Sequence, residues 1–127
     1  MRILIADDNR LVRRGVARIL SGYAGWEMCA EASDGLDALQ KAPEFHPDLI
    51  LIDIQMPGMD GLETSRRLRE ELPEIKIVIM SHNDADKLLP DARKAGADGC
   101  VDKAHIVTDL PVVVENIWNP SLDTRSR

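Results

Sequence analysis

The sequence predicts an α/β fold in which helices cover both faces of a doubly wound, five-stranded parallel sheet with strand order 2-1-3-4-5. Short apolar runs alternate five times with amphipathic helical patterns, and this alternation is typical of a parallel sheet. Residues 48–53 form the most continuous aliphatic run and belong at the centre, whereas residues 26–32 alternate charged and apolar side chains and belong at an edge. Right-handed crossovers then favour this strand order.

Length and composition indicate one domain with an aliphatic core. The chain has 127 residues, of which 44% are hydrophobic and only 3% are aromatic. Its net charge of −6 and its scattered basic residues argue against direct binding of nucleic acid. The apolar runs are too short to cross a membrane and no signal peptide is recognised, so we expect a cytoplasmic protein. Residues 1–118 are assigned to the domain, and residues 119–127 to a polar tail or the start of a linker.

Each element has a local signal. The first run is almost continuously aliphatic, and the helix after it has apolar residues at i, i+4, i+7 and i+8. Asp34 is the expected N-cap of the second helix, Pro43 should end that helix at Ala42, and Gly96 should follow the fourth. The expected strands are 2–6, 26–32, 48–53, 75–80 and 98–102, and the expected helices are 10–21, 34–42, 61–71, one ending near Ala95 and one ending near Trp118.

Two further prolines bear on the last two helices. Pro90 would lie inside the fourth helix, where a proline removes a hydrogen bond and clashes with the preceding turn at a cost of ~3 kcal/mol or more. We therefore expect that helix to begin near Leu89 or Pro90, with residues 84–88 irregular or 3₁₀. If Asp109 is the N-cap of the last helix, Pro111 falls in its first turn and is tolerated.

Acidic side chains follow two strands that are neighbours in this order. Asp7 and Asp8 come directly after the first strand, Asp53 ends the third, and Lys103 follows the fifth. Because parallel strands end at one edge of the sheet, these groups should meet there, near the switch point of strand order. Clustered carboxylates repel one another, and a hard cation relieves the repulsion. The sequence therefore predicts a Mg²⁺ site beside a phosphoryl-binding position.

Each of these groups has a predicted role. Asp8 and Asp53 are the expected direct ligands of Mg²⁺ together with the backbone carbonyl of Gln55, and Asp7 is expected to act through a metal-bound water. Asp53 is also the candidate nucleophile, since a carboxylate can accept a phosphoryl group as an acyl phosphate. Lys103 offers a compact positive charge to the phosphoryl oxygens.

Ser81, at the end of the fourth strand, can donate a hydroxyl hydrogen bond to another phosphoryl oxygen.

Taken singly, the site residues have ordinary explanations. Asp7 and Asp8 would serve as a helix N-cap pair, Asp53 as a strand-end acid and Lys103 as a solvated lysine. Their joint occurrence at three strand ends favours a site. The basic face of the first helix is expected to be solvated, and it consists of Arg10, Arg13, Arg14 and Arg18.

The chain resembles the receiver domain of two-component response regulators over about residues 1–118. The resemblance rests on Asp7-Asp8, on Asp53 within Leu-Ile-Asp-Ile-Gln-Met-Pro-Gly-Met-Asp-Gly, on Ser81 and on Lys103. The segment Ile-Ala-Asp-Asp-Asn-Arg-Leu-Val-Arg-Arg-Gly-Val, and Ala104 where a proline is usual, are similar to the NarL-type branch. The resemblance implies a CheY-like, flavodoxin-like three-layer sandwich.

The resemblance also implies a mechanism and partners. A sensor histidine kinase would phosphorylate Asp53 with Mg²⁺ bound, and Ser81 would then move toward the phosphoryl group. The face formed by the fourth helix, the fifth strand and the fifth helix would change, and it would pair two copies as a homodimer or contact an output domain. NarL-type members usually carry a DNA-binding domain after the receiver, so DNA is expected as a partner only through a C-terminal domain outside this chain. No membrane partner is expected.

Some positions depart from the family. Cys100 stands where Tyr or Phe is usual. One hypothesis is weaker or differently routed coupling, and the alternative is that Cys100 merely packs as a small apolar group. His82 either narrows access to the site or is an exposed loop residue. Gln55 and Asn83 occupy positions that tune dephosphorylation in the family.

Two other functions stay open. One is a small Mg²⁺-dependent phosphohydrolase, but the usual Asp-x-Asp is absent because Arg10 lies two residues beyond Asp8. The other is a degenerate receiver that acts only as a protein–protein module. The intact site residues argue against it, while Cys100 keeps it open. A phosphoacceptor switch, the first interpretation, is not expected to turn over an independent substrate.

Overall fold

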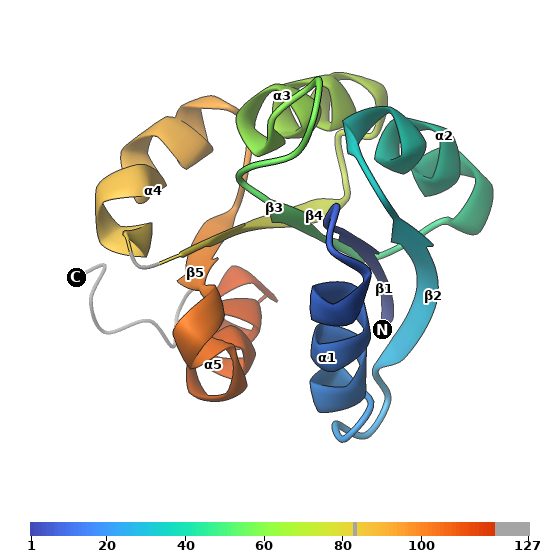
Figure 1. The fold of residues 1–127 in the computed structure, drawn as a ribbon, viewed down its shortest axis with the longest axis vertical. Coiled ribbons are helices and arrows are strands. Elements are labelled where there is room, and N and C mark those ends of the chain that lie inside the picture. The colour runs from blue at the N-terminus through green and yellow to red at the C-terminus, as the bar shows by residue number, and fades with distance from the viewer. Residues whose placement is uncertain (83, 119–127) are drawn as a thin grey trace.

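The computed structural model describes residues 1–82 and 84–118, and these form a three-layer α/β sandwich (Figure 1). The strands are β1 (Arg2–Ala6), β2 (Glu27–Ala32), β3 (Leu49–Asp53), β4 (Lys76–Ser81) and β5 (Gly99–Asp102). The helices are α1 (Arg10–Leu20), α2 (Gly35–Phe45), α3 (Gly61–Glu71), α4 (Ala85–Lys94) and α5 (Ile106–Trp118), with a 3₁₀ turn, η1 (Lys103–His105), before α5. All strand pairs are parallel, and the order is β2-β1-β3-β4-β5. The predicted fold class and strand order are therefore confirmed.

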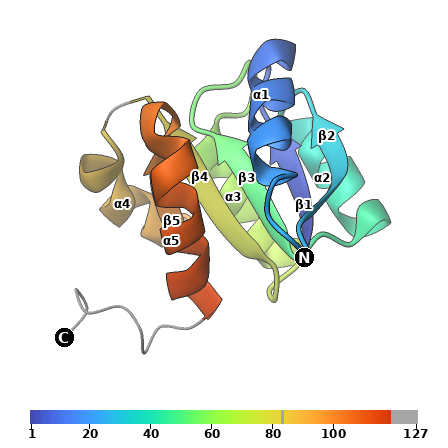
Figure 2. The same cartoon turned by 90° about the horizontal axis from the view of Figure 1, so that it is seen from below.

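The helices divide between the two faces of the sheet. α1 and α5 cover one face, and α2, α3 and α4 cover the other (Figures 1 and 2). Successive residues of a strand point to opposite faces, so the buried aliphatic run of β3 supplies both cores. Leu49 and Leu51 pack with the α1 and α5 side, whereas Ile50 and Ile52 pack with the other. This double burial explains why the central strand shows no polar alternation.

The strand register brings the ends of β1 and β3 together. Ala6 is paired with Ile52, so the acidic residues that follow β1 lie beside the last residue of β3. On the other side, Asp53 is paired with Met80 of β4. The carboxyl ends of β1, β3 and β4 thus lie side by side at one edge of the sheet.

The starts of α1 and α2 are set by side-chain caps. The Asn9 side chain accepts hydrogen bonds from the N–H groups of Leu11 and Val12 at the start of α1. Asp34 accepts from Asp37 at the start of α2, as predicted. Because Asn9 takes the N-cap position of α1, Asp7 and Asp8 are not required as a capping pair.

The sequence predicted that Pro43 would end α2 and that Pro90 would delay the start of α4, and both predictions were wrong. α2 runs through Pro43 to Phe45, and α4 begins at Ala85 and continues through Pro90. Pro43 and Pro90 are both exposed, so the carbonyl that each leaves without its helical donor can bind water. Packing holds α4 in place around its proline, since Leu88 contacts the core and Ala92 is fully buried.

The prediction for α5 was also wrong. The helix begins at Ile106, so Asp109 is not its N-cap and Pro111 lies in the interior. Ile106, Leu110 and Val114 form a buried stripe at i, i+4 and i+8 against the sheet. This stripe fixes the helix on both sides of Pro111, and tertiary packing outweighs the local cost of the proline.

Within residues 1–82 and 84–118, no helix is long and apolar enough to cross a membrane. The predicted tail, residues 119–127, lies outside the described residues, as does Asn83.

Candidate functional site: an acidic cluster with one lysine

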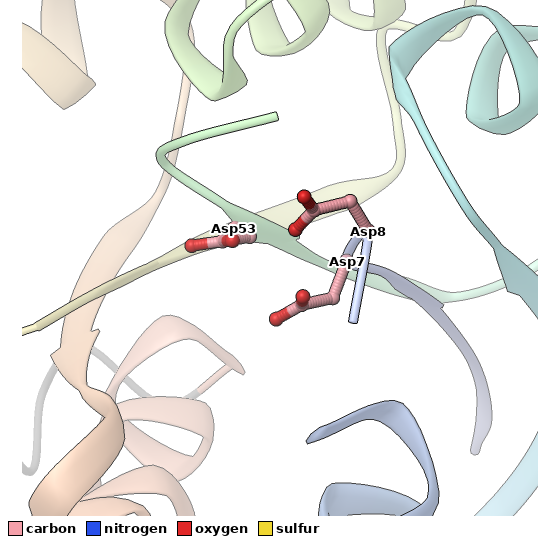
Figure 3. A group of neighbouring side chains, drawn as sticks. All are labelled: Asp7, Asp8 and Asp53. Atoms are coloured by element: carbon pink, nitrogen blue, oxygen red, sulfur yellow. The ribbon is translucent and has the colours of Figure 1, made fainter. Parts of the chain in front are cut away.

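Three carboxylates meet at the carboxyl edge of the sheet, where the sequence placed them. Asp7 and Asp8 follow β1, and Asp53 ends β3 beside them (Figure 3). Each offers an oxygen within 4.8 Å of the oxygens of the other two. Asp7 is fully buried and Asp53 is 3% exposed, whereas Asp8 is open to solvent. The cluster therefore has two buried members and one that solvent can reach.

Lys103 is the cation of this cluster. It follows β5 at the start of the 3₁₀ turn, and its Nζ lies 2.8 Å from Asp7 Oδ2 and 3.2 Å from Asp53 Oδ1. Nζ donates a hydrogen bond to Asp7. The approach to Asp53 is an ion pair without hydrogen-bond geometry, so among the described residues the buried Oδ1 of Asp53 has no hydrogen-bond partner. One charged ammonium thus faces two buried carboxylates.

Asp7 has both carboxylate oxygens engaged by the protein. Oδ1 accepts the backbone N–H of Asn9 at 2.9 Å, and Oδ2 accepts the Lys103 ammonium. A third contact holds the backbone here, since the guanidinium of Arg13 donates to the Asp7 carbonyl at 2.6 Å. Both oxygens of Asp7 are therefore held by the protein, and its action on a metal through a water stays a prediction.

The electrostatics of the site follow from burial and charge crowding. Burial and the neighbouring Asp7 raise the pKa of the Asp53 carboxyl, although Lys103 and the backbone N–H of Gln55 act to lower it. Burial by itself would lower the pKa of Lys103, but the hydrogen bond to Asp7 and the charges of Asp53 and Asp7 outweigh it and raise that pKa. The lysine therefore stays charged, and the cluster carries more negative than positive charge.

The residues present fit a hard divalent cation. A buried carboxylate oxygen without a hydrogen-bond partner lies close to a second carboxylate that is open to solvent. Mg²⁺ prefers oxygen ligands, keeps several waters and uses only one or two protein carboxylates, and Asp53 with Asp8 matches this donor set. Gln55 is exposed next to the cluster in sequence, and its carbonyl remains a predicted ligand.

Ser81 is fully buried at the end of β4, but it does not hydrogen bond to the cluster. Its hydroxyl donates to Asp102 Oδ1 at 2.7 Å, across the β4–β5 pairing that sets Ser81 opposite Asp102. His82 is exposed, which supports its interpretation as a loop residue. The structure therefore joins Asp7, Asp53 and Lys103 directly and holds Ser81 by another carboxylate.

Sequence reasoning missed two residues that support the site. Arg13 was expected to be solvated, but its side chain is only 14% exposed because it bonds to the Asp7 carbonyl and to Glu31. Gly61 packs so closely on β3 that a Cβ would lie 2.4 Å from the Asp53 carbonyl oxygen. No periodic pattern distinguishes Arg13 from its neighbours. Gly61 is the glycine after Met-Asp in the loop, but its place in the sequence does not by itself predict that it packs against β3.

Cys100 is half-buried on β5 and packs against the core on the α4 side of the sheet. Burial, with the charge of Asp102 as the next cause, raises the pKa of its thiol to about 11. The contacts agree with a small packing residue. Whether the missing aromatic weakens coupling stays a hypothesis.

Comparison with known proteins agrees with this geometry. Residues 3–115 match the family described as the response regulator receiver domain. The chain is 38% identical over 118 residues to the response regulator GacA of Pseudomonas viridiflava, an alignment covering 93% of this chain and 55% of that protein. It is 32% identical over 119 residues to the response regulator protein VraR of Staphylococcus saprophyticus, covering 94% and 57% respectively. The chain thus spans about half the length of these relatives.

Solved structures show the same fold. A LuxR-family two-component response regulator from Aurantimonas sp. SI85-9A1 superposes with a TM-score of 0.86 at 30% identity, covering 94% of this chain and 85% of that one. The signal receiver domain of a response regulator named NarL from Mycobacterium tuberculosis gives 0.77 at 31% identity, covering 89% and 95%. With the acidic cluster and the lysine in place, the chain belongs to the receiver domains of two-component response regulators.

Proposed function

We propose that Asp53 accepts a phosphoryl group from a sensor histidine kinase in a reaction that needs Mg²⁺. Asp8, Asp53 and the backbone carbonyl of Gln55 would hold the ion directly, with Asp7 acting through a water. When bound, Mg²⁺ neutralises negative charge as the phosphoryl group approaches and aligns it with the acceptor. The reaction would take place in the cytoplasm, where the sequence leads us to expect the chain.

The observation that carries the proposal is the state of the Asp53 carboxylate. It is 3% exposed, it lies 3.2 Å from an ammonium, and its Oδ1 lacks a hydrogen-bond partner among the described residues. A buried acid with an uncommitted oxygen costs the fold stability, and such acids are found where the oxygen serves a ligand or a reaction. The other buried acid of the cluster, Asp7, has no such free oxygen.

The transfer forms one bond and breaks one. A carboxylate oxygen of Asp53 bonds to phosphorus as the P–N bond to the kinase histidine breaks. The imidazole, protonated on its other nitrogen, leaves as a neutral ring with the electron pair of that bond. Lys103 stays protonated and shifts part of its charge interaction from the carboxylate to the new phosphoryl oxygens. The product is an acyl phosphate on Asp53.

The consequence proposed for this switch is a change in the face formed by α4, β5 and α5. That face would pair two copies of the chain or contact an output domain. Because the matched relatives are nearly twice as long and a similar structure is of a LuxR-family regulator, we propose a DNA-binding output domain beyond this chain. Gene regulation would follow from phosphorylation through that domain.

Incubation with acetyl phosphate and Mg²⁺, followed by intact mass, tests the chemistry. We expect one phosphoryl adduct in the wild-type chain and none in Asp53→Asn, while Asp91→Asn, an exposed acid on α4, should match the wild type. An adduct that persists in Asp53→Asn would contradict the assignment. Sustained hydrolysis of small phosphate esters over many turnovers would favour a phosphohydrolase instead.

A further inference from the structure

One oxygen of Asp102 holds two groups that belong to different parts of the fold. Asp102 Oδ1 accepts the Ser81 hydroxyl at 2.7 Å and the backbone N–H of Ala85 at 3.0 Å. Ser81 ends β4, and Ala85 is the first residue of α4. The same carboxylate is on the residue directly before Lys103, the cation of the acidic cluster.

Asp102 thereby does for α4 what an N-cap side chain usually does. The N-cap residue of α4, Asp84, makes no capping hydrogen bond with its own side chain among the described residues. Asp34 and Asp60, the acids at the N-caps of α2 and α3, each accept a helix N–H. One of the first amides of α4 is therefore satisfied from β5, and this ties the start of the helix to the neighbouring strand.

The Ser81 hydroxyl has a single proton to donate. It can give that proton to Asp102 or to an oxygen of a group on Asp53, but not to both. The register places Ser81 at the same edge of the sheet as Asp53, since Asp53 is paired with Met80, the residue before Ser81. A phosphoryl group carries several negative oxygens, and these are strong acceptors for a nearby hydroxyl.

We propose that Asp102 is a positioning residue that holds Ser81 away from the acidic cluster and links its release to the first turn of α4. This inference rests on the proposed function of Asp53. When Ser81 turns to a phosphoryl group, Asp102 loses one of its two partners and is held less firmly at the start of α4. The link runs from the site to α4 without an aromatic residue on β5, where this chain has Cys100.

Titration with beryllofluoride in the presence of Mg²⁺ tests the link in a double-mutant cycle. Asp102→Ala removes the competing acceptor, so beryllofluoride should bind roughly 2- to 10-fold more tightly than to the wild type. In a Ser81→Ala background the same substitution should leave the affinity unchanged. Asp102→Asn keeps an acceptor oxygen at the same place and should lie between the wild type and Asp102→Ala.

If Asp102 had a merely structural role, Asp102→Ala would change the beryllofluoride affinity equally in the wild-type and Ser81→Ala backgrounds. An equal shift with and without Ser81, or weaker binding by Asp102→Ala alone, would overturn the inference while leaving the role of Asp53 intact. Failure of the wild-type chain to bind beryllofluoride would overturn the proposed function and this inference together.

Hydrogen exchange at the Ala85 amide tests the link to α4. Exchange should become faster in the wild type when beryllofluoride binds, because Asp102 is then held by fewer partners. It should be unaffected by beryllofluoride in Ser81→Ala, where that partner is already missing. Unchanged exchange in the wild type would show that Ser81 moves without consequence for the helix.

Discussion

The ammonium of Lys103 donates its hydrogen bond to Asp7, a residue 96 positions away in the sequence, at 2.8 Å. It does so although the acceptor carboxylate of Asp53 lies only 3.2 Å from the same nitrogen. Asp7 thus keeps the lysine in place, and Asp53 keeps an oxygen for a ligand.

Replacing Lys103 by methionine should destabilise the fold. Two buried carboxylates lose their counter-charge, and removing one partner of a buried pair costs roughly 3–5 kcal/mol, less where the pair is partly solvated. Lys103 is 19% exposed, so we expect a loss of roughly 2–4 kcal/mol in the free energy of unfolding. Urea denaturation at neutral pH measures it, and Lys87→Met on the exposed face of α4 should change it by less than about 0.5 kcal/mol.

The pH range of this loss follows from the lysine. Its pKa is raised in the folded state, so its contribution is complete below the unfolded pKa and disappears only as the pH rises through the folded pKa. The difference between the wild type and Lys103→Met should therefore persist through neutral pH. If the difference vanished as the pH rose from about 7 to about 9, the result would contradict the ion pair.

Asp53→Asn should stabilise the metal-free protein at neutral pH. The pKa of Asp53 is raised by burial and by Asp7, so the folded state binds its proton more strongly than the unfolded chain. The contribution of the wild-type acid is thus present below its unfolded pKa of about 3.9 and is lost as the pH rises through the folded pKa. The advantage of Asp53→Asn should be small at about pH 4 and should grow by about pH 7.

Thermal unfolding without Mg²⁺ measures this trend. A gain of about 1 kcal/mol corresponds to a few degrees in a domain of this size. Asp91→Asn, which removes an exposed acid, is the matched control. An equal gain for Asp53→Asn at both pH values would show that the negative charge of Asp53 does not destabilise the folded state.

Mg²⁺ should raise the melting temperature of the wild type by mass action. Binding to the folded state alone contributes about 2.7 kcal/mol at a concentration of 100 Kd. Asp8→Asn should weaken this stabilisation, because it removes the solvent-facing carboxylate of the cluster, yet it should leave the metal-free stability nearly unchanged. Glu70→Gln, an exposed change on α3, should respond to Mg²⁺ as the wild type does; equal responses in all three would argue against a site at Asp8.

Pro90→Ala should stabilise α4. The substitution restores an N–H that can donate to the carbonyl of Asp86, one turn earlier in the helix, and removes the ring clash, which together cost about 3 kcal/mol in an ideal helix. Because α4 accommodates Pro90 and the position is exposed, we expect a gain of roughly 1–3 kcal/mol by urea denaturation. Lys87→Ala in the same helix is the control. A loss of stability would mean that the proline is needed for the shape of α4.

The Cys100 thiol should react slowly with alkylating reagents. Its pKa of about 11, raised by burial and then by Asp102, leaves little thiolate at neutral pH. Cys29 is the other cysteine of the sequence, so it is first replaced by serine. In that Cys29→Ser background the alkylation rate at about pH 8 should be on the order of 100-fold below that of a free thiol, and it should rise with pH. Fast alkylation at about pH 8 would show that β5 opens locally.

The sequence alone determined the sheet and the composition of its acidic edge. Continuous aliphatic runs mark the buried strands and an alternating run marks β2, and both patterns depend only on neighbouring residues. Once the order of strands is known, Asp7, Asp8 and Asp53 must lie together, because parallel strands end at one edge.

Tertiary structure decided which partner each side chain takes. α4 and α5 continue through Pro90 and Pro111 because apolar residues before and after each proline pack against the core, an energy that local propensity does not contain. Likewise, Ser81 bonds to Asp102 because the β4–β5 register sets them opposite each other. Such choices join groups far apart in the chain, and their free energies depend on burial and angle, which appear only when the sheet is assembled.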